Sequence, residues 1–253
     1  MRPLVSRTFL LLAASVLTAC EAGGTREADS ASRLRVAAAA EASGQMDIAL
    51  SMYAAAAARD PEDAEAQARF AGALVRTGNR SQAEQVLAAA VQRRPNDRRL
   101  QIQLGRLRLQ TGAAGQALEI FDRILAADSR DVAALDGRGV ALDLMGRHAE
   151  AQESYRRAQA LSPGSISIAN NLGLSLLLDG RAEEARAVLE PFARRPDAPA
   201  RVTANYAISL AATGDAAGAR AVLNDPEADL DGLAAALRSN RQVIEVTPAA
   251  GRS

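Results

Sequence analysis

The stretch Ile168–Pro191, IANNLGLSLLLDGRAEEARAVLEP, decides the fold of this chain. Its first half repeats apolar residues one helical turn apart from Leu172 onward, and it ends in an Asp-Gly pair at Gly180. Its second half places Ala185 and Leu189 four residues apart. Residues four apart lie on the same face of an α-helix. The stretch therefore predicts two short helices that pack against each other across a tight turn.

The same helix–turn–helix pattern recurs every 34 residues in both directions along the chain. The units begin at residues 30, 64, 98, 132, 166 and 200, with no insertion between them. The fifteenth residue of every unit is a glycine: Gly44, Gly78, Gly112, Gly146, Gly180 and Gly214. The twentieth is an alanine: Ala49, Ala83, Ala117, Ala151, Ala185 and Ala219. Helix pairs with this period resemble the tetratricopeptide repeat.

Each repeated residue has a physical reason for its place. A glycine that ends a helix adopts the left-handed conformation without a Cβ clash. The alanine, facing a small residue at the eighth position, allows a close helix crossing. The twenty-fourth position is large and one turn after the alanine, so we expect it in the core; it holds Tyr53, Leu87, Phe121, Tyr155, Leu189 and Leu223.

These features predict an all-α fold over residues 30–226, with six helix pairs stacked into a solenoid that shares one continuous core. The tetratricopeptide resemblance implies a superhelix with a concave inner surface. Pro191 falls inside the second helix of the fifth unit, so we expect that helix to end or kink near Glu190. Residues 227–238 predict a capping helix, and residues 239–253, which include the apolar Val243–Val246 run, predict a disordered tail.

The first nineteen residues have the pattern of a signal peptide. Two arginines precede the apolar run Thr8–Leu17, which is too short to span a bilayer. The sequence Leu-Thr-Ala-Cys that ends at Cys20 resembles a bacterial lipobox. That resemblance implies that Cys20 carries the lipid anchor of the mature protein. The alternative is an ordinary signal peptide with a chance cysteine.

Residues 20–29, in which EAGGTREAD follows the cysteine, are small and polar and predict a flexible tether between membrane and repeats. Glu21 follows the lipidated position. In the lipoprotein sorting rule, an aspartate at that position retains the protein in the inner membrane, so Glu21 favours the outer membrane.

Composition argues against several classes of function. Lys plus Arg and Asp plus Glu both number 30, no basic stripe occurs, and we expect no nucleic-acid partner. With one Cys and one His, the chain lacks a two-cysteine or Cys/His zinc site and an internal disulfide. His148 opens a predicted helix and is expected to be a solvated surface residue. We see no phosphate loop or nucleophile motif, so we predict no enzyme, no cofactor, no metal and no small-molecule substrate.

The tetratricopeptide resemblance instead implies a groove lined by the first helices, where protein partners bind. Mapping the family's groove positions here gives the polar residues Arg76, Arg99, Arg106, Asp136, Asp143 and Asn170, and the apolar residues Ile102, Leu109, Val140, Leu144, Leu174, Leu177, Leu178 and Ile208. The run Leu174–Leu178 holds more apolar residues than one core face needs. These residues either form an exposed patch for a partner or are buried by the neighbouring unit.

The segment Asn170–Asp215 carries a more specific resemblance, through NNLGLSLLLDGR, the early-ending LEP helix, RPDAPARV and NYAISLAATGD. It resembles the TadD lipoproteins of tight-adherence (Flp, type IVc) pilus systems. Tyr206 and Ile208 depart from the leucines more common there. The resemblance implies an outer-membrane, periplasm-facing scaffold or pilotin that binds the pilus secretin or other assembly proteins. Two alternatives stay open: another envelope adaptor, for barrel assembly, cell-wall synthesis or polysaccharide export, and an enzyme or small-ligand receptor.

Overall fold

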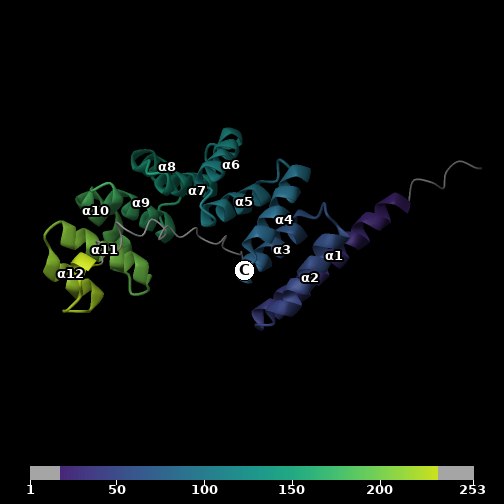
Figure 1. Ribbon diagram of the computed structural model, residues 1–253, viewed down its shortest axis with the longest axis horizontal. Helices are drawn as coiled ribbons and strands as arrows, with labels where there is room; N and C mark the ends of the chain where they lie inside the picture. Colours follow the sequence, from purple (N-terminus) through teal and green to yellow (C-terminus); the bar gives the residue numbers. More distant parts are fainter. Residues whose placement is uncertain (1–17, 233–253) are drawn as a thin grey trace, which may run out of the picture. The chain divides into compact units, whose positions relative to one another are not determined.

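The structure is a computed structural model that describes the backbone of residues 18–232 and side chains from residue 30 onward. The part it describes is helical (Figure 1), with helices α1 (Thr18–Ala42), α2 (Met46–Arg59), α3 (Ala64–Arg76), α4 (Arg80–Arg93), α5 (Arg98–Gln110), α6 (Ala114–Ala127), α7 (Val132–Leu144), α8 (His148–Leu161), α9 (Ile166–Leu178), α10 (Ala182–Ala193), α11 (Ala200–Ala212) and α12 (Ala216–Leu223). Residues 1–17 of the expected signal peptide and the expected tail at 239–253 lie outside the described residues.

Side-chain caps and glycine turns set the limits of these helices. The side chains of Asp63, Asp97, Asp131 and Ser165 each accept a backbone N–H in the first turn of α3, α5, α7 and α9. Such caps stabilise a helix start by about 1 kcal/mol. The repeated glycines end the first helices, and all six have a positive φ, between 75° and 90°. The helix limits therefore follow from local chemistry: the glycine turn recurs in all six units, and the side-chain cap in four of them.

Helix α1 differs from expectation. It runs without a break through residues 20–29, so the prediction of a flexible tether there is wrong. Once a helix is nucleated, each further residue adds a hydrogen bond. The helix-forming Glu, Ala and Arg residues on both sides of Gly23-Gly24 outweigh the cost of about 1 kcal/mol for each glycine.

Two further boundaries differ near the end of the described chain. Helix α10 continues past Pro191 to Ala193, because the following turn is still closed by the Arg194 N–H on the Glu190 carbonyl. After α12, the next helix begins at Leu230 and not at residue 227. The side chain of Asp225 accepts the Glu227 N–H, which holds this stretch in a turn before the helix. The end of the predicted capping helix lies outside the described residues.

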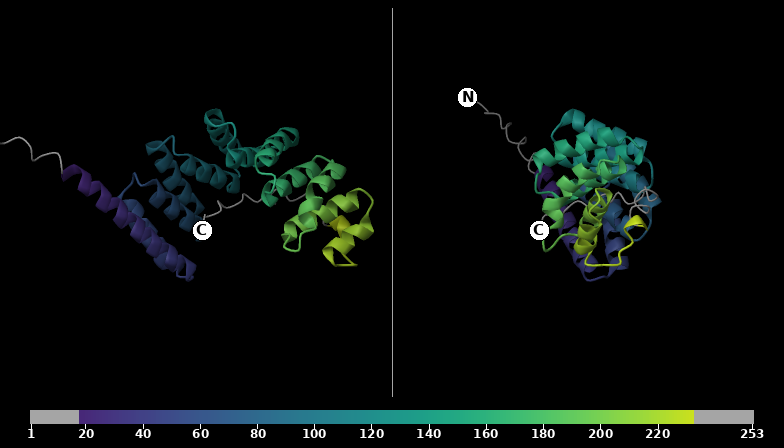
Figure 2. Two further views of the ribbon diagram at one scale, coloured as in Figure 1. Left: turned by 180° about the vertical axis from the view of Figure 1, so that it is seen from behind. Right: turned by 90° about the vertical axis from the view of Figure 1, so that its left-hand side faces the viewer.

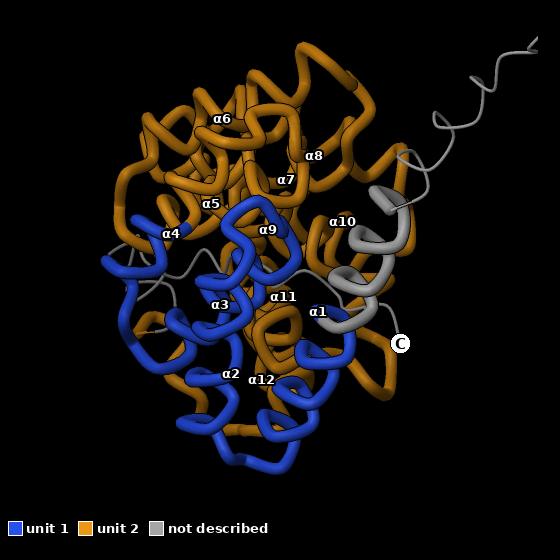
Figure 3. Tube along the Cα trace, turned by 90° about the vertical axis from the view of Figure 1, so that its right-hand side faces the viewer, with its two compact units in different colours: residues 1–86 blue, residues 87–253 orange. Residues whose placement is uncertain are grey.

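The chain divides into two compact units, residues 1–86 and 87–253 (Figure 3). In the first unit α2 packs against both α1 and α3. Its core includes Leu34, Ala37 and Tyr53, with Phe70 of α3 packed against it.

In the second unit the helices form two layers (Figures 1 and 2). The first helices of the repeats contact one another in the order α5, α7, α9, α11, while each of the second helices α6, α8 and α10 packs against the first helices before and after it. Direct contact between successive first helices makes their layer the shorter one, so this layer lies on the inside of the curve. We call the surface of α5, α7, α9 and α11 that points away from the second helices the inner face.

In the core of the repeats, large side chains pack against alanines and glycines of the facing helix. All six repeated alanines are 0% exposed. The eighth-position glycines face the twenty-fourth position and make room for it: a Cβ on Gly173 would lie 2.5 Å from Leu189, and one on Gly105 would lie 2.7 Å from Phe121. The expectation that small residues meet small residues at this crossing is therefore incomplete, because a large side chain occupies the space that each glycine leaves.

Candidate partner-binding face

An apolar cluster lies on the inner face, apart from the main core. Leu174 of α9 and Ile208 of α11 are buried against each other, 3% and 6% exposed. Leu177 and Leu178 are half-buried and pack against this pair. We call these four residues the inner-face cluster. The run Leu174–Leu178 therefore combines the two alternatives, burial and an exposed patch. The neighbouring repeat buries Leu174 and leaves Leu177 and Leu178 partly exposed.

The last turn of α7 adds apolar surface of the same kind. Leu144 occupies the repeat position that Leu178 occupies one unit later, and it is half-buried. Met145, which follows it, is 45% exposed. Large exposed apolar side chains are few among the described residues, where only Val36 and Ile48 are comparable. The ends of two successive first helices thus both present apolar side chains.

Towards α5 the inner face becomes polar. Asp136 of α7 is half-buried and accepts a hydrogen bond from Asn171 Nδ2 at 2.9 Å. Burial raises the pKa of Asp136, although Asn171 and the charge of Arg106 oppose the rise. Burial likewise lowers the pKa of Arg106, and the charge of Asp136 opposes that change. Two of the predicted groove residues therefore interact with each other through their charges.

Asn170 faces a neighbouring repeat and is not available at the surface. It is 5% exposed, and its Oδ1 accepts a hydrogen bond from Asn205 Nδ2 at 3.0 Å. Asn205 lies 35 residues later on α11, at the repeat position that Asn171 occupies in α9. The structure therefore uses this predicted groove residue to join the fifth and sixth repeats.

Asp143 is also buried, with a side chain that is 2% exposed. Its Oδ2 accepts the Tyr155 hydroxyl at 3.1 Å, and its Oδ1 accepts the Ser175 hydroxyl at 2.7 Å. His148 Nδ1 lies 2.8 Å from the same Oδ1. Burial raises the pKa of Asp143, and these hydrogen bonds and the charge of His148 oppose the rise. Asp143 therefore connects three helices of two repeats and offers no free carboxylate to a partner.

His148, which was expected to be a solvated surface residue, contacts the same Asp143 carboxylate, so that expectation is wrong. Its side chain is 23% exposed and makes a specific contact with the Asp143 carboxylate, so it is not a freely solvated residue. The turn at Gly146 brings the first residue of α8 back onto the last turn of α7, where Asp143 lies. The position of His148 within its repeat does not by itself predict its contact with Asp143.

The sequence carries one signal for the Asp143 cluster, in the residues at the twelfth and twenty-fourth repeat positions. The twenty-fourth residue is a tyrosine in only two of the six units, and in both the twelfth residue is an acid. Tyr53 donates to Glu41 at 3.0 Å in the first repeat, as Tyr155 does to Asp143 in the fourth. The remaining units have apolar residues at both positions. A buried hydroxyl needs a partner, so the paired change predicts the contact.

The two other basic groove residues are exposed. Arg76 belongs to the first unit, where its Nε lies 2.6 Å from Glu41 Oε1. Arg99 lies in the first turn of α5 in the second unit. The predicted groove residues therefore include exposed cations, half-buried leucines and buried polar groups that hold repeats together.

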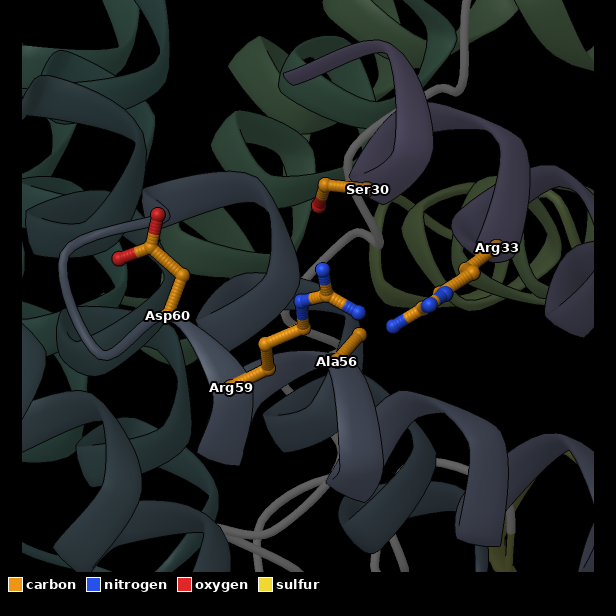
Figure 4. A pocket seen from close by; sticks show the side chains of 5 residues that line it. All are labelled: Ser30, Arg33, Ala56, Arg59 and Asp60. Carbon is orange, nitrogen blue, oxygen red and sulfur yellow. The ribbon is translucent and has the colours of Figure 1, made fainter. Parts of the chain in front are cut away.

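Two of the cavities lie entirely among residues that the structure describes. One, of about 330 Å³ in the first unit, is lined by Ser30, Arg33, Ala56, Arg59 and Asp60 (Figure 4). The other, of about 410 Å³, lies among α10, α11 and α12 and includes Arg186, Tyr206 and Asp215. Each lining contains two arginines and one aspartate, so each cavity has one more positive than negative side chain.

Among residues 18–232, no three His, Cys, Asp or Glu side chains gather in a way that would hold a metal ion. Within the same residues, no helix has the length and hydropathy needed to span a membrane.

Comparison with known proteins agrees with the repeat pattern. Two tetratricopeptide-repeat family models match residues 40–101 and 102–166, which together make up half of the chain. No curated protein matches significantly.

Solved structures show the same fold at low sequence identity. A tetratricopeptide repeat protein from Parabacteroides merdae superposes with a TM-score of 0.66 at 16% identity, covering 83% of this chain and 84% of that one. The pilF protein of Pseudomonas aeruginosa gives 0.67 at 16% identity, covering 78% and 90%. A Thermus thermophilus tetratricopeptide protein gives 0.60 at 23% identity, covering 72% and 99%.

Proposed function

The chain belongs to the tetratricopeptide-repeat family, whose repeats serve as protein-interaction scaffolds, and from this premise we propose that its inner face binds a segment of a protein partner at the inner-face cluster. One observation carries the proposal. Leu174, Ile208, Leu177 and Leu178 form an apolar cluster separate from the core, and two of its members keep part of their surface open to solvent. Apolar surface gathered in one place is typical of interaction sites.

The buried polar side chains beside the inner-face cluster are not available to bind a partner. Asp143 and Asn170 are satisfied by hydrogen bonds inside the protein, so they leave the apolar residues as the available contacts. Partner recognition there is consequently driven by burial of Leu177 and Leu178, with Leu144 and Met145 at the margin. Such grooves hold a partner's apolar anchor residues in shallow pockets.

The cellular role that we propose is that of an outer-membrane lipoprotein in tight-adherence pilus assembly. The lipobox-like sequence at Cys20 and the TadD-like segment Asn170–Asp215 support it. The chain would act without catalysis: the lipid anchor at Cys20 holds the inner face near one membrane and raises its effective concentration for a secretin or another assembly protein.

A charge placed in the inner-face cluster tests the binding site. In crosslinked envelopes, the Leu177→Asp plus Leu178→Asp variant is expected to capture at least tenfold less partner, because two carboxylates would have to be desolvated in the interface. The matched control, Ala149→Asp plus Ala187→Asp, adds the same charge at exposed positions of α8 and α10 and is expected to capture partner normally. Circular dichroism verifies that both variants keep their helix content.

The identity of the captured protein tests the cellular role. Recovery of a secretin or pilus-assembly protein with outer membranes supports the pilus assignment. Recovery of barrel-assembly, cell-wall or polysaccharide-export proteins instead would keep the binding face and discard that assignment. Undiminished capture by the folded Leu177→Asp plus Leu178→Asp variant would show that this cluster is not the binding site.

A further inference from the structure

The inner-face cluster lies two helices away from the last helix of the part of the chain that carries the C-terminal end of the described residues. The described chain ends at Gly232, shortly after Leu230, which is buried at 8% exposure. Helix α12 packs against α11, and α11 packs against α9. Since the axes of packed helices lie about 8–10 Å apart, the axes of α9 and α12 are at most about 20 Å apart where they pass α11.

The sequence beyond Gly232 supplies both a span and an anchor. Ten residues, 233–242, separate Gly232 from the run Val243-Ile244-Glu245-Val246. Fully extended they would reach about 33 Å. With residues 233–238 helical, as the sequence predicts, they would still reach about 22 Å. Either length exceeds the separation of about 20 Å between the axes of α9 and α12.

The chemistry of the segment matches that of the cluster. Three β-branched apolar residues occur within four positions, and Ile244 and Val246 would share one side of an extended chain. A short linker gives such a segment an effective concentration in the millimolar range. A segment whose affinity is too low for binding between separate molecules can therefore still bind within one molecule.

We propose that residues 243–246 of this chain bind its own inner-face cluster and cover Leu177 and Leu178 until a partner displaces them. The proposal rests on the proposed function of this face as a binding site and adds its regulation. Because the tail and the partner compete for one surface, the apparent affinity for the partner is reduced by the fraction of molecules in which the tail is bound.

Disulfide trapping in the full-length chain tests the contact. In a Cys20→Ser background the introduced cysteines are the only thiols. Leu178→Cys plus Ile244→Cys is expected to form an intramolecular disulfide at least tenfold faster than the control Ala217→Cys plus Ile244→Cys. Ala217 is exposed on α12 and lies nearer to the tail in sequence, so random collision would favour the control. Equal rates, or disulfide-linked dimers in place of intramolecular bonds, would overturn the proposal.

Thiol labelling gives a second, independent measurement. A single Leu178→Cys should be alkylated several-fold faster when Val243→Asp, Ile244→Asp and Val246→Asp are combined with it, because the charged tail no longer covers the thiol. An unchanged rate would overturn the tail contact. Failure of the two proposals can be told apart: loss of trapping with normal, cluster-dependent capture removes only the tail contact. If the disulfide forms as expected but partner capture does not depend on Leu177 and Leu178, the proposed binding function of the cluster is removed.

Discussion

Asp143 carries a buried carboxylate that receives hydrogen bonds from Tyr155 and Ser175 and contacts His148. Removing a charged group from water is costly, and the cost is offset here only by these partners. Glu41 in the first repeat has the same tyrosine partner, but the guanidinium of Arg76 supplies a permanent positive charge. The two repeats therefore satisfy the same tyrosine–acid pair in different ways.

Acid titration should detect Asp143 directly. Burial raises its pKa, so the folded protein binds a proton at this carboxyl more readily than the unfolded chain. Its contribution to the free energy of unfolding is largest below the ordinary aspartate pKa of about 3.9 and is lost as the pH rises through the raised value. In urea unfolding at pH 4 to 6, Asp143→Asn is expected to lose less stability with rising pH than the wild type.

Asp131 provides the control for this titration. Although burial would raise the pKa of Asp131, hydrogen bonds from Arg98 and the Ala134 backbone lower it below its usual range. Its stabilising contribution is therefore present above about pH 3.9 and is lost as the pH falls through the lowered pKa. Asp131→Asn should change the dependence of the unfolding free energy on pH only below about pH 3.9. A slope between pH 4 and 6 that is identical in Asp143→Asn and wild type would contradict the assignment to Asp143.

At the scale of the element, α10 shows how a helix tolerates a proline near its end. Pro191 has no N–H to give to the Ala187 carbonyl, yet the helix continues for two residues. Its ring is exposed and contributes no core packing, while Phe192, the next residue, is buried at 5% exposure. Burial of Phe192 favours continuation of the helix over a stop at Glu190.

Replacing this proline should stabilise the protein. Pro191→Ala restores one helical hydrogen bond, and the gain exceeds the added freedom of the unfolded chain, so the free energy of unfolding is expected to rise by about 2 kcal/mol. Pro163→Ala, in the exposed turn between α8 and α9, is the control and should lower it by about 0.5 kcal/mol. Chemical denaturation measures both, and a loss of stability in Pro191→Ala would show that the proline has a favourable role.

At the scale of the whole molecule, repeat packing explains why several polar side chains of the first helices are enclosed between repeats. Each first helix in the second unit contacts the next first helix, so side chains between them are enclosed by two repeats. Asn171–Asp136, Ser175–Asp143 and Asn205–Asn170 are all hydrogen bonds of this kind. Polar residues at these positions hold adjacent repeats in register, and the leucines beside them form the accessible surface.

The lipid anchor is a prediction about the whole molecule, because it changes where the protein resides and leaves its repeats unaltered. Cys20→Ser is expected to keep the helix content but to move the protein from the membrane to the soluble fraction, and to mislocalise the partner. Ala22→Ser, two residues further on, is the control and should stay membrane-bound. A Cys20→Ser protein that still sediments with the membranes would exclude lipidation as the means of attachment.

The sequence by itself determined the all-α tetratricopeptide fold, which the family match and the similar structures confirm. It could do so because the signals are local: a glycine at the end of each first helix, a small residue at each crossing and a fixed 34-residue interval. The same local signals misjudged residues 20–29 and the stretch after Pro226, where continued hydrogen bonding and an aspartate turn decided the outcome.

Only the tertiary structure decided which groove positions are accessible. Repeat register assigns Asp143, Asn170 and Leu178 to one face, and packing then buries the first two and leaves the third partly open. The physical reason is that burial depends on the neighbouring repeat, 34 residues away, whose Ser175 or Asn205 must arrive with the matching hydrogen-bonding group. A pattern within one repeat specifies the direction of a side chain, whereas the adjacent repeat determines what that side chain meets.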